Sequence, residues 1–172
     1  MQASISFRPL QRSDFLPLQE WLAAPHVAAW WNERNDLASV EAKYGPRVDG
    51  TEPTHVFVIE RECRPIGWIQ WYLWADYPEH ARQLGAELAS AGIDLAIGDP
   101  KATGLGLGPV IILEFLKQSI FTNSSICAVV ADPDESNLRS LHAFRKAGFN
   151  VVNTVQLASE SFRRQVVRLV RP

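Results

Sequence analysis

The seven residues from Ser125 to Ala131 form a run in which no charged residue occurs and apolar residues predominate. A strand with one exposed face alternates apolar and polar residues, whereas a continuous apolar run is typical of a strand covered on both faces. Asp132-Pro133 ends the run, because proline has no backbone N–H for a ladder. The run therefore predicts a sheet whose faces are covered by helices.

Hydrophobic periodicity along the rest of the chain predicts alternating strands and helices. The expected strands are residues 5–10, 55–59, 65–74, 91–98, 125–131, 149–157 and 162–170. The expected helices run from Ser13 or Asp14 to Pro25, over 36–44, over 109–121, and from Ser136 or Asn137 to Gly148, with 76–89 a loop or a short helix. Gly45 and Pro46 are expected to end the second helix. In the absence of a linker or repeat, we expect a single α/β domain over residues 1–172.

Composition and charge exclude several classes of protein. The 172 residues include 17 basic and 19 acidic ones, giving a net charge of −2 without the basic excess of a nucleic-acid-binding protein. No apolar run reaches the roughly 18 residues of a membrane span, and the first residues lack a signal-peptide pattern. Two cysteines do not form a disulfide framework. We expect a cytoplasmic protein with neither a nucleic-acid nor a membrane partner.

A glycine-rich turn, Thr103-Gly104-Leu105-Gly106-Leu107-Gly108-Pro109, separates an expected strand from an apolar helix. Glycines let backbone approach a ligand closely, and the N–H groups of a helix's first turn bind phosphate. The alternative is a connection that binds nothing. A dinucleotide-binding fingerprint does not fit, because no acidic residue ends a second strand about 20 residues later, and no Gly-Lys-Ser/Thr of a P-loop follows.

The segment from Ser136 to Phe149 has Asn137 at a helix start, an aromatic residue at Phe144 and Lys-Ala-Gly-Phe at the helix end. Together with the glycine turn, it resembles the acyl-CoA-binding core of the GNAT N-acetyltransferase superfamily. The resemblance implies a central mixed, mostly antiparallel sheet of six to seven strands flanked by about four helices. It implies acetyl-CoA as co-substrate, held by Leu95, Ala96, Thr103, Gly104, Leu105, Gly106, Leu107, Gly108, Asn137 and Phe144.

Two positions depart from the superfamily pattern. Thr103 stands where the glycine turn usually begins with Arg or Gln, so pyrophosphate binding must depend on backbone amides and on Lys101. Phe144 stands where a Tyr commonly serves as general acid for the departing thiolate, and a phenyl ring has no proton to give. Coenzyme A thiolate is a tolerable leaving group at neutral pH, so water or no specific acid is expected to serve there.

A narrower resemblance covers about residues 5–170. The segments His26–Trp31, Pro65–Tyr72, Gly92–Asp94 and Asp132-Pro133 are similar in order and spacing to aminoglycoside 6′-N-acetyltransferases. Siderophore-pathway lysine N-acyltransferases share the N-terminal architecture and are the nearest competitors. The resemblance implies acetylation of an aminoglycoside 6′-amine by its direct attack on the thioester.

Asp94 is the expected catalytic base. An alkyl ammonium must lose a proton before it attacks, and a nearby carboxylate can accept that proton directly or through water. Asp94 lies in the apolar strand Gly-Ile-Asp-Leu-Ala-Ile, and burial raises the pKa of a carboxyl group. The alternative is a carboxylate that faces solvent or caps a neighbouring element. Backbone amides near Leu95 and Ala96 are expected to meet the thioester.

The expected substrate-binding residues carry aromatic rings or negative charge. A polycationic aminoglycoside needs more than one carboxylate, and aromatic faces stack on sugars and attract ammonium groups. At least three tryptophans are expected in the core instead, and an Asp before proline also starts turns. No metal site is expected, since the four histidines lie far apart in sequence. The expected set is Trp30, Trp31, Gln70, Tyr72, Asp76 and Asp132.

Two other functions remain open. One is acylation of a lysine- or hydroxylysine-type siderophore precursor or of a polyamine, which requires a neutral, tunnel-like cleft. The other is a degenerate acyl-CoA-binding module, suggested by Thr103 and Phe144. Either a monomer or a homodimer is compatible with the sequence.

Overall fold

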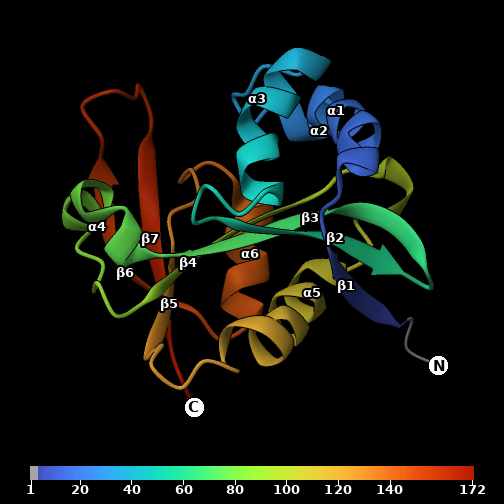
Figure 1. The fold of residues 1–172 in the computed structure, drawn as a ribbon. Coiled ribbons are helices and arrows are strands. Elements are labelled where there is room, and N and C mark those ends of the chain that lie inside the picture. Colours follow the sequence, from blue (N-terminus) through green and yellow to red (C-terminus); the bar gives the residue numbers. More distant parts are fainter. Residues whose placement is uncertain (1–3) are drawn as a thin grey trace. The chain divides into compact units, whose positions relative to one another are not determined.

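The computed structural model describes residues 4–172 and has a mixed α/β fold (Figure 1). The strands are β1 (Ile5–Pro9), β2 (His55–Arg61), β3 (Arg64–Leu73), β4 (Ala91–Ile97), β5 (Ala128–Ala131), β6 (Asn150–Gln156) and β7 (Arg163–Val170). The α-helices are α1 (Phe15–Ala23), α2 (Pro25–Ala28), α3 (Leu37–Val48), α4 (Pro78–Leu84), α5 (Leu107–Phe115) and α6 (Leu138–Lys146). Single turns of 3-10 helix lie at Arg12–Asp14, Trp74–Asp76 and Pro100–Ala102, and a π-helical turn at Leu116–Ile120 follows α5.

Hydrogen bonds link the seven strands in the order β1-β2-β3-β4-β5-β7-β6. β4 pairs with β5 in parallel, whereas β1 with β2, β5 with β7, and β6 with β7 are antiparallel. The expected mixed, mostly antiparallel sheet is confirmed. Within residues 4–172 there are six α-helices rather than about four, because α2 and α4 are too short to leave a strong periodic signal.

The chain divides into two compact units. The first contains the residues up to Gln70 together with Asp94–Leu107, and the second contains Trp71–Ile93 together with Gly108–Pro172. β3 passes from the first unit to the second after Gln70, and β4 returns after Ile93. The single domain expected over residues 1–172 stays a prediction.

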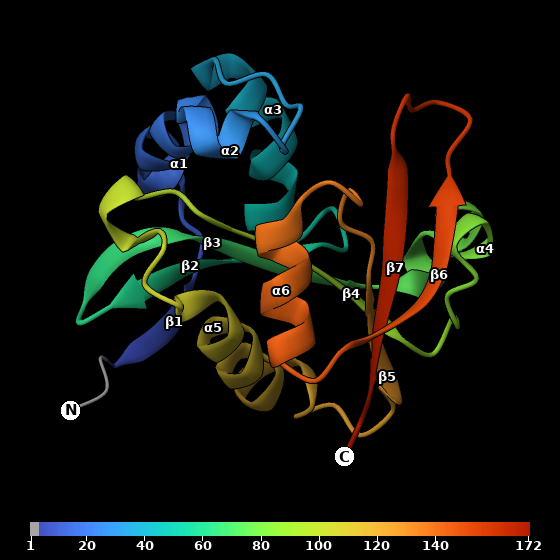
Figure 2. The same cartoon turned by 180° about the vertical axis from the view of Figure 1, so that it is seen from behind.

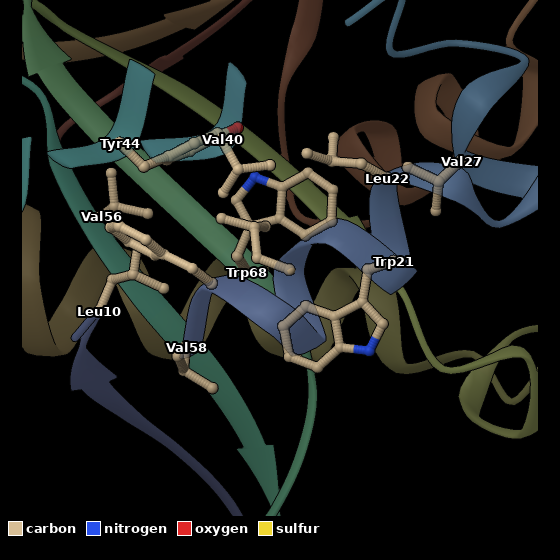
Figure 3. Packing of buried hydrophobic residues seen from close by; sticks show 11 residues of the cluster. Leu10, Trp21, Leu22, Val27, Val40, Tyr44, Val56, Val58 and Trp68 are labelled. Atoms are coloured by element: carbon tan, nitrogen blue, oxygen red, sulfur yellow. The ribbon is translucent and has the colours of Figure 1, made fainter. Parts of the chain in front are cut away.

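The core of the first unit is built around Trp68 on β3 (Figure 3). Trp21 of α1 stacks on the Trp68 indole with ring centroids 6.3 Å apart, and the edge of Trp31 meets it at 4.9 Å. The expectation that at least three tryptophans lie in the core is confirmed, since Trp21, Trp68 and Trp74 are buried. Aromatic pairs in these geometries contribute beyond the area they bury.

The helix expected to end at Tyr44 instead runs on through Gly45 and Pro46 to Val48. Proline in a helix loses one backbone hydrogen bond and crowds the preceding turn. That cost is limited here because α3 ends two residues after Pro46, while Val40 and Tyr44 anchor the helix in the core. Tertiary packing therefore overrides the local breaker signal.

Asp14 stands at the start of α1 as expected, but its carboxylate does not cap the helix. It accepts hydrogen bonds from both terminal nitrogens of Arg8, at 2.7 and 2.8 Å, and from the Gln11 N–H at 2.9 Å. Burial raises the pKa of Asp14, but the bonds from Arg8 and Gln11 together lower the pKa to below its ordinary value. The carboxylate therefore ties α1 to β1 and not to its own helix.

In the second unit, α4 packs on β5 and β7 through Ala81, Leu84, Val130 and Val166. All four residues of β5 are buried, as the apolar run predicts. Helices α5 and α6 are neighbours (Figure 2) and approach each other closely at Gly108. A Cβ on Gly108 would lie only 2.9 Å from the Cβ of Ala143. The α5 segment begins at Leu107, two residues before the expected Pro109, and ends in the π-helical turn.

The β2–β3 hairpin turn contains two strained residues, which generate a stability prediction. Glu62 and Cys63 have φ of 52° and 61°, where a side chain costs about 1–2 kcal/mol per residue. Asn-Gly suits this turn, so we expect the pair Glu62→Asn with Cys63→Gly to stabilise the protein by about 1 kcal/mol. Thermal unfolding should show Tm raised by about 2–4 °C; an unchanged or lower Tm would contradict the strain.

Candidate functional site

The middle of the glycine turn, residues 104–106, is exposed, and two of its glycines have a backbone geometry that glycine adopts more readily than other residues. Gly104 and Gly106 have φ of +73° and +72°, and no atom lies within 4 Å of a Cβ built on either. Open space beside both backbones, at the start of α5, leaves room for a ligand phosphate next to N–H groups that lack intrahelical acceptors. Gly108 differs, because its missing side chain is explained by the contact with Ala143.

Thr103 serves the turn itself. Its hydroxyl donates to the Pro100 carbonyl at 2.8 Å, and the Asp99 carboxylate accepts from the Lys101 N–H at 2.9 Å. The threonine proton is therefore used inside the turn and is not offered to an anion. Lys101 is exposed beside it. The expectation that backbone amides of this turn, and not the Thr103 side chain, bind the pyrophosphate stays a prediction.

Asn137 and Phe144 on α6 have structural roles. Asn137 is the N-cap of α6, and its side chain accepts from the Ser140 N–H at 3.1 Å. Phe144 is buried and meets the ring of Phe149 edge to face at 5.0 Å. Their contact with a cofactor stays a prediction.

Asp94 and Gln70 are brought together, although 24 positions separate them in the sequence. Gln70 Nε2 donates to Asp94 Oδ2 at 2.9 Å, and Gln70 Oε1 accepts from an Arg47 terminal nitrogen at 2.9 Å. Arg47 Nε in turn donates to the carboxylate of Glu52. Gln70 is buried while Asp94 is half-buried, so the network runs from the interior to a carboxylate that solvent reaches in part.

Tyr44 lies beside this network on α3. Its hydroxyl donates to Glu33 at 3.2 Å, and Glu33 also pairs with Lys43. Burial, together with the negative charges of Glu33 and Asp94, raises the pKa of Tyr44 well above its ordinary value, and Arg47 opposes this only in part. Tyr44 therefore stays a neutral hydrogen-bond donor across the physiological range.

β4 lies close to β3 because Gly67 has no side chain. A Cβ there would be 2.1 Å from the Ala96 carbonyl oxygen. A side chain at Gly98, just after β4, would overlap the Trp21 ring. Leu95 and Ala96 are half-buried on this strand, and the roles expected of their backbone amides stay predictions.

The adjacent tryptophans differ in exposure. Trp31 is half-buried against Trp68, and Trp30 is 44% exposed. Trp30 is thus the one placed to meet a solvent-borne molecule. His26, nearby in α2, hydrogen-bonds through Nε2 to the Ile97 carbonyl at 2.9 Å and so ties α2 to the end of β4.

In the second unit, Tyr72 occupies the space that a side chain at Gly92 would fill. A Cβ on Gly92 would lie 2.2 Å from the Tyr72 ring. Tyr72 also meets Trp74 and Tyr77 edge to face, at 5.2 and 5.1 Å. Asp76 follows in an exposed turn. The Tyr72 ring is therefore held on three sides.

Asp132, expected to bind substrate, already has partners within the second unit. Asp132 is buried, at 6% exposure, and its Oδ2 lies 3.2 Å from an Arg164 terminal nitrogen and 3.3 Å from His80 Nε2. The same Arg164 nitrogen donates to the Asp132 backbone carbonyl, and Arg164 also pairs with Glu160. The Asp132-Pro133 dipeptide gives no indication in the sequence that Arg164, on β7, pairs with the aspartate. Its contact with substrate stays a prediction.

Sequence reasoning missed several polar residues of these networks, among them Arg47 and Arg164. The expected helix end at Tyr44 places Arg47 outside the helix. In a continuous helix, residues three apart share a face, and Arg47 lies over the Tyr44 ring at 5.3 Å. Across residues 4–172, no group of three His, Cys, Asp or Glu side chains is placed to hold a metal ion. In the same part of the chain, no helix has the length and apolarity to cross a membrane.

The chain is similar to known N-acetyl- and N-acyltransferases over most of its length. Aminoglycoside N(6′)-acetyltransferase type 1 of Klebsiella pneumoniae is 28% identical over 155 residues, which cover 88% of this chain and 77% of the relative. Lysine N-acyltransferase MbtK of Mycolicibacterium paratuberculosis is 26% identical over 129 residues, covering 75% of this chain and 58% of that protein.

Solved structures agree with this. The crystal structure of the aminoglycoside acetyltransferase AAC(6′)-Ib in complex with coenzyme A superposes with a TM-score of 0.82 at 26% identity, covering 98% of this chain and 95% of that chain. The family model of the acetyltransferase (GNAT) domain matches residues 11–157. Because that match covers most of the chain, the chain belongs to the GNAT acetyltransferase domain family.

Proposed function

We propose that this protein transfers the acetyl group of acetyl-CoA to the 6′-amine of an aminoglycoside. The likeness to AAC(6′)-Ib over 98% of the chain carries the proposal, and structures of that relative include complexes with coenzyme A and kanamycin or ribostamycin. The half-buried Asp94, with its hydrogen bond from Gln70, supplies the chemistry that the reaction needs.

In the proposed reaction, the substrate ammonium gives one proton to Asp94, directly or through water. The neutral amine then attacks the thioester carbonyl, so that a C–N bond forms and the C–S bond breaks. The second amine proton ends on the departing sulfur. Phe144 has no proton to donate, so this step relies on the modest basicity of the thiolate and on water.

The glycine turn is the proposed site for the pyrophosphate of acetyl-CoA. Gly104 and Gly106 are exposed, with open space where side chains would stand. Phosphate charge is stabilised by the N–H groups at the start of a helix. The exposed Lys101 adds a positive charge next to the turn.

Acylation of a lysine-type substrate is the second candidate, favoured by the similarity to MbtK. A steady-state assay with acetyl-CoA and a panel of aminoglycosides, beside lysine and hydroxylysine, separates the two. We expect the aminoglycosides to have the highest kcat/KM. Preference for lysine or hydroxylysine would favour the second function, and coenzyme A binding without turnover would indicate a binding module.

The pyrophosphate placement predicts that Gly106→Val raises KM for acetyl-CoA about tenfold or more. A side chain there fills the space beside the backbone amides. Gly50→Val is the matched control, because Gly50 also has a positive φ, +73°, and open surroundings. Both variants carry the same backbone strain. Equal KM values for acetyl-CoA in the two variants would contradict the placement.

The catalytic role predicts that Asp94→Asn lowers kcat by roughly 10²-fold or more, the usual range for a positioned base. Asparagine has the same shape, so circular dichroism and Tm should stay close to the wild type. The deficit should shrink at high pH, where more of the amine is already neutral. A deficit of the same size at pH 6 and pH 9 would leave Asp94 with a binding role alone.

We also propose that Asp132 binds a second ammonium group of the substrate. Asp132→Asn and Arg164→Met both break the same ion pair, so a purely structural role would shift KM in the same direction. If Asp132 binds substrate, the first variant raises the aminoglycoside KM about tenfold and the second lowers it, because Arg164 no longer competes. Measuring both KM values at low and high salt checks this, since added salt screens the attraction.

A further inference from the structure

The positive charge of Arg47 sets the orientation of the Gln70 side-chain amide, which lies between Arg47 and Asp94. A glutamine amide has a donor end and an acceptor end of nearly equal shape. Here Oε1 accepts from Arg47 and Nε2 donates to Asp94, each at 2.9 Å. Turning the amide over would place N–H groups against the guanidinium and oxygen against the carboxylate.

Burial makes that reversal costly. The Gln70 side chain is 6% exposed, so little water is at hand to replace a lost hydrogen bond. An unmet polar group in such a place costs far more than a normal hydrogen bond contributes. As long as Arg47 is present, one of the two amide orientations is excluded.

Arg47 is itself held in place from two sides. Its Nε donates to Glu52, whose other oxygen accepts from the Thr54 hydroxyl at 2.9 Å. Its guanidinium lies over the Tyr44 ring at 5.3 Å, and its side chain is 12% exposed. A chain of side chains therefore runs from the segment before β2, through α3 and β3, to the carboxylate on β4.

We propose that Arg47 is a positioning residue for acetyl transfer, which fixes the Gln70 amide so that its N–H faces Asp94 and holds that carboxylate ionised and oriented toward the amine. This inference rests on the proposed function of Asp94 as the group that takes the amine proton. Gln70 is thereby assigned to the carboxylate and not to direct contact with substrate.

The charged and titratable groups around Asp94 limit what a pH titration reports. Arg47 and Glu52 form one pair, Lys43 and Glu33 form another, and Tyr44 lies between them. The raised pKa of Tyr44 keeps it protonated below pH 10. Tyr44 therefore does not contribute to a rate profile measured below that pH, and comparison with Asp94→Asn identifies the part of the profile that depends on Asp94.

The experiment compares Arg47→Met with Arg8→Met. Both remove a partly buried arginine that pairs with carboxylates in the first unit, but Arg8 binds Asp14 and Glu60 and does not contact Gln70. One readout is kcat/KM against pH for an aminoglycoside. The other is the side-chain carboxyl titration of Asp94 by NMR, assigned by loss of its signal in Asp94→Asn, which needs no activity.

For Arg47→Met we expect the Asp94 titration midpoint and the acid limb of kcat/KM to rise together by about 0.5–1 pH unit, because the carboxylate loses its fixed donor. The KM for acetyl-CoA should change less than twofold. Arg8→Met should lower Tm without moving either curve. Gln70→Glu keeps an acceptor for Arg47 but puts a negative charge beside Asp94, so it should shift both curves further upward.

Arg47→Lys keeps a donor for Gln70 Oε1 and should recover part of the wild-type profile. It also serves where Arg47→Met does not fold. The proposal that Arg47 fixes the Gln70 amide is overturned if the Asp94 titration does not move in Arg47→Met. Where that variant does not fold, the proposal is overturned if the titration moves in neither Arg47→Lys nor Gln70→Glu. A shifted titration with an unshifted rate profile overturns the role in acetyl transfer. If the wild type acetylates no amine while the Asp94 titration still shifts in Arg47→Met, the proposed function fails, but the positioning of the Gln70 amide by Arg47 is supported.

Discussion

The burial of Trp68 is the constraint on which the first unit depends. Its indole receives the stacked ring of Trp21 and the edge of Trp31, so α1 and the segment after α2 are both fixed on β3. Residues two apart on a strand share a face, and Gln70 follows Trp68 by two. The packing that anchors the helices therefore also sets the face on which the Gln70 amide meets Asp94. Within residues 4–172 the Trp68 Nε1 has no acceptor, so the ring is held there by its apolar area.

Much of the fold was predictable because it depends on local patterns. The strands follow apolar runs and alternation, and the glycine at 148 ends α6 with φ of +93°. The end of α3 was not predictable, since Gly45-Pro46 is a breaker by every local rule and only packing of Val40 and Tyr44 overrides it. That single misplaced boundary hid Arg47. Asp94 and Gln70 were each expected in the site, but a hydrogen bond between neighbouring strands depends on register, which no local pattern states.

The two aspartates singled out from the sequence have different electrostatic surroundings. Asp132 accepts from a guanidinium, which neutralises its charge at short range. The hydrogen bond from Gln70 to Asp94 comes from a neutral amide, and the positive charge of Arg47 lies one residue further away. A neutral donor orients a carboxylate and lowers its proton affinity less than a cation does. Asp132 thus receives a hydrogen bond from a charged donor, and Asp94 receives one from a neutral donor.

Three glycines around β4 affect how functional residues of this chain would be inferred from sequence variation across species. Gly67, Gly92 and Gly98 each leave a space that the Ala96 carbonyl, the Tyr72 ring and the Trp21 ring fill, respectively. None of the three has a side chain that can take part in a reaction, yet any larger residue meets a neighbouring atom at little more than 2 Å. Selection against substitution should therefore be as strong at these glycines as at Asp94. A ranking of positions by invariance alone would place them beside the proposed base, although the glycines would be preserved for shape.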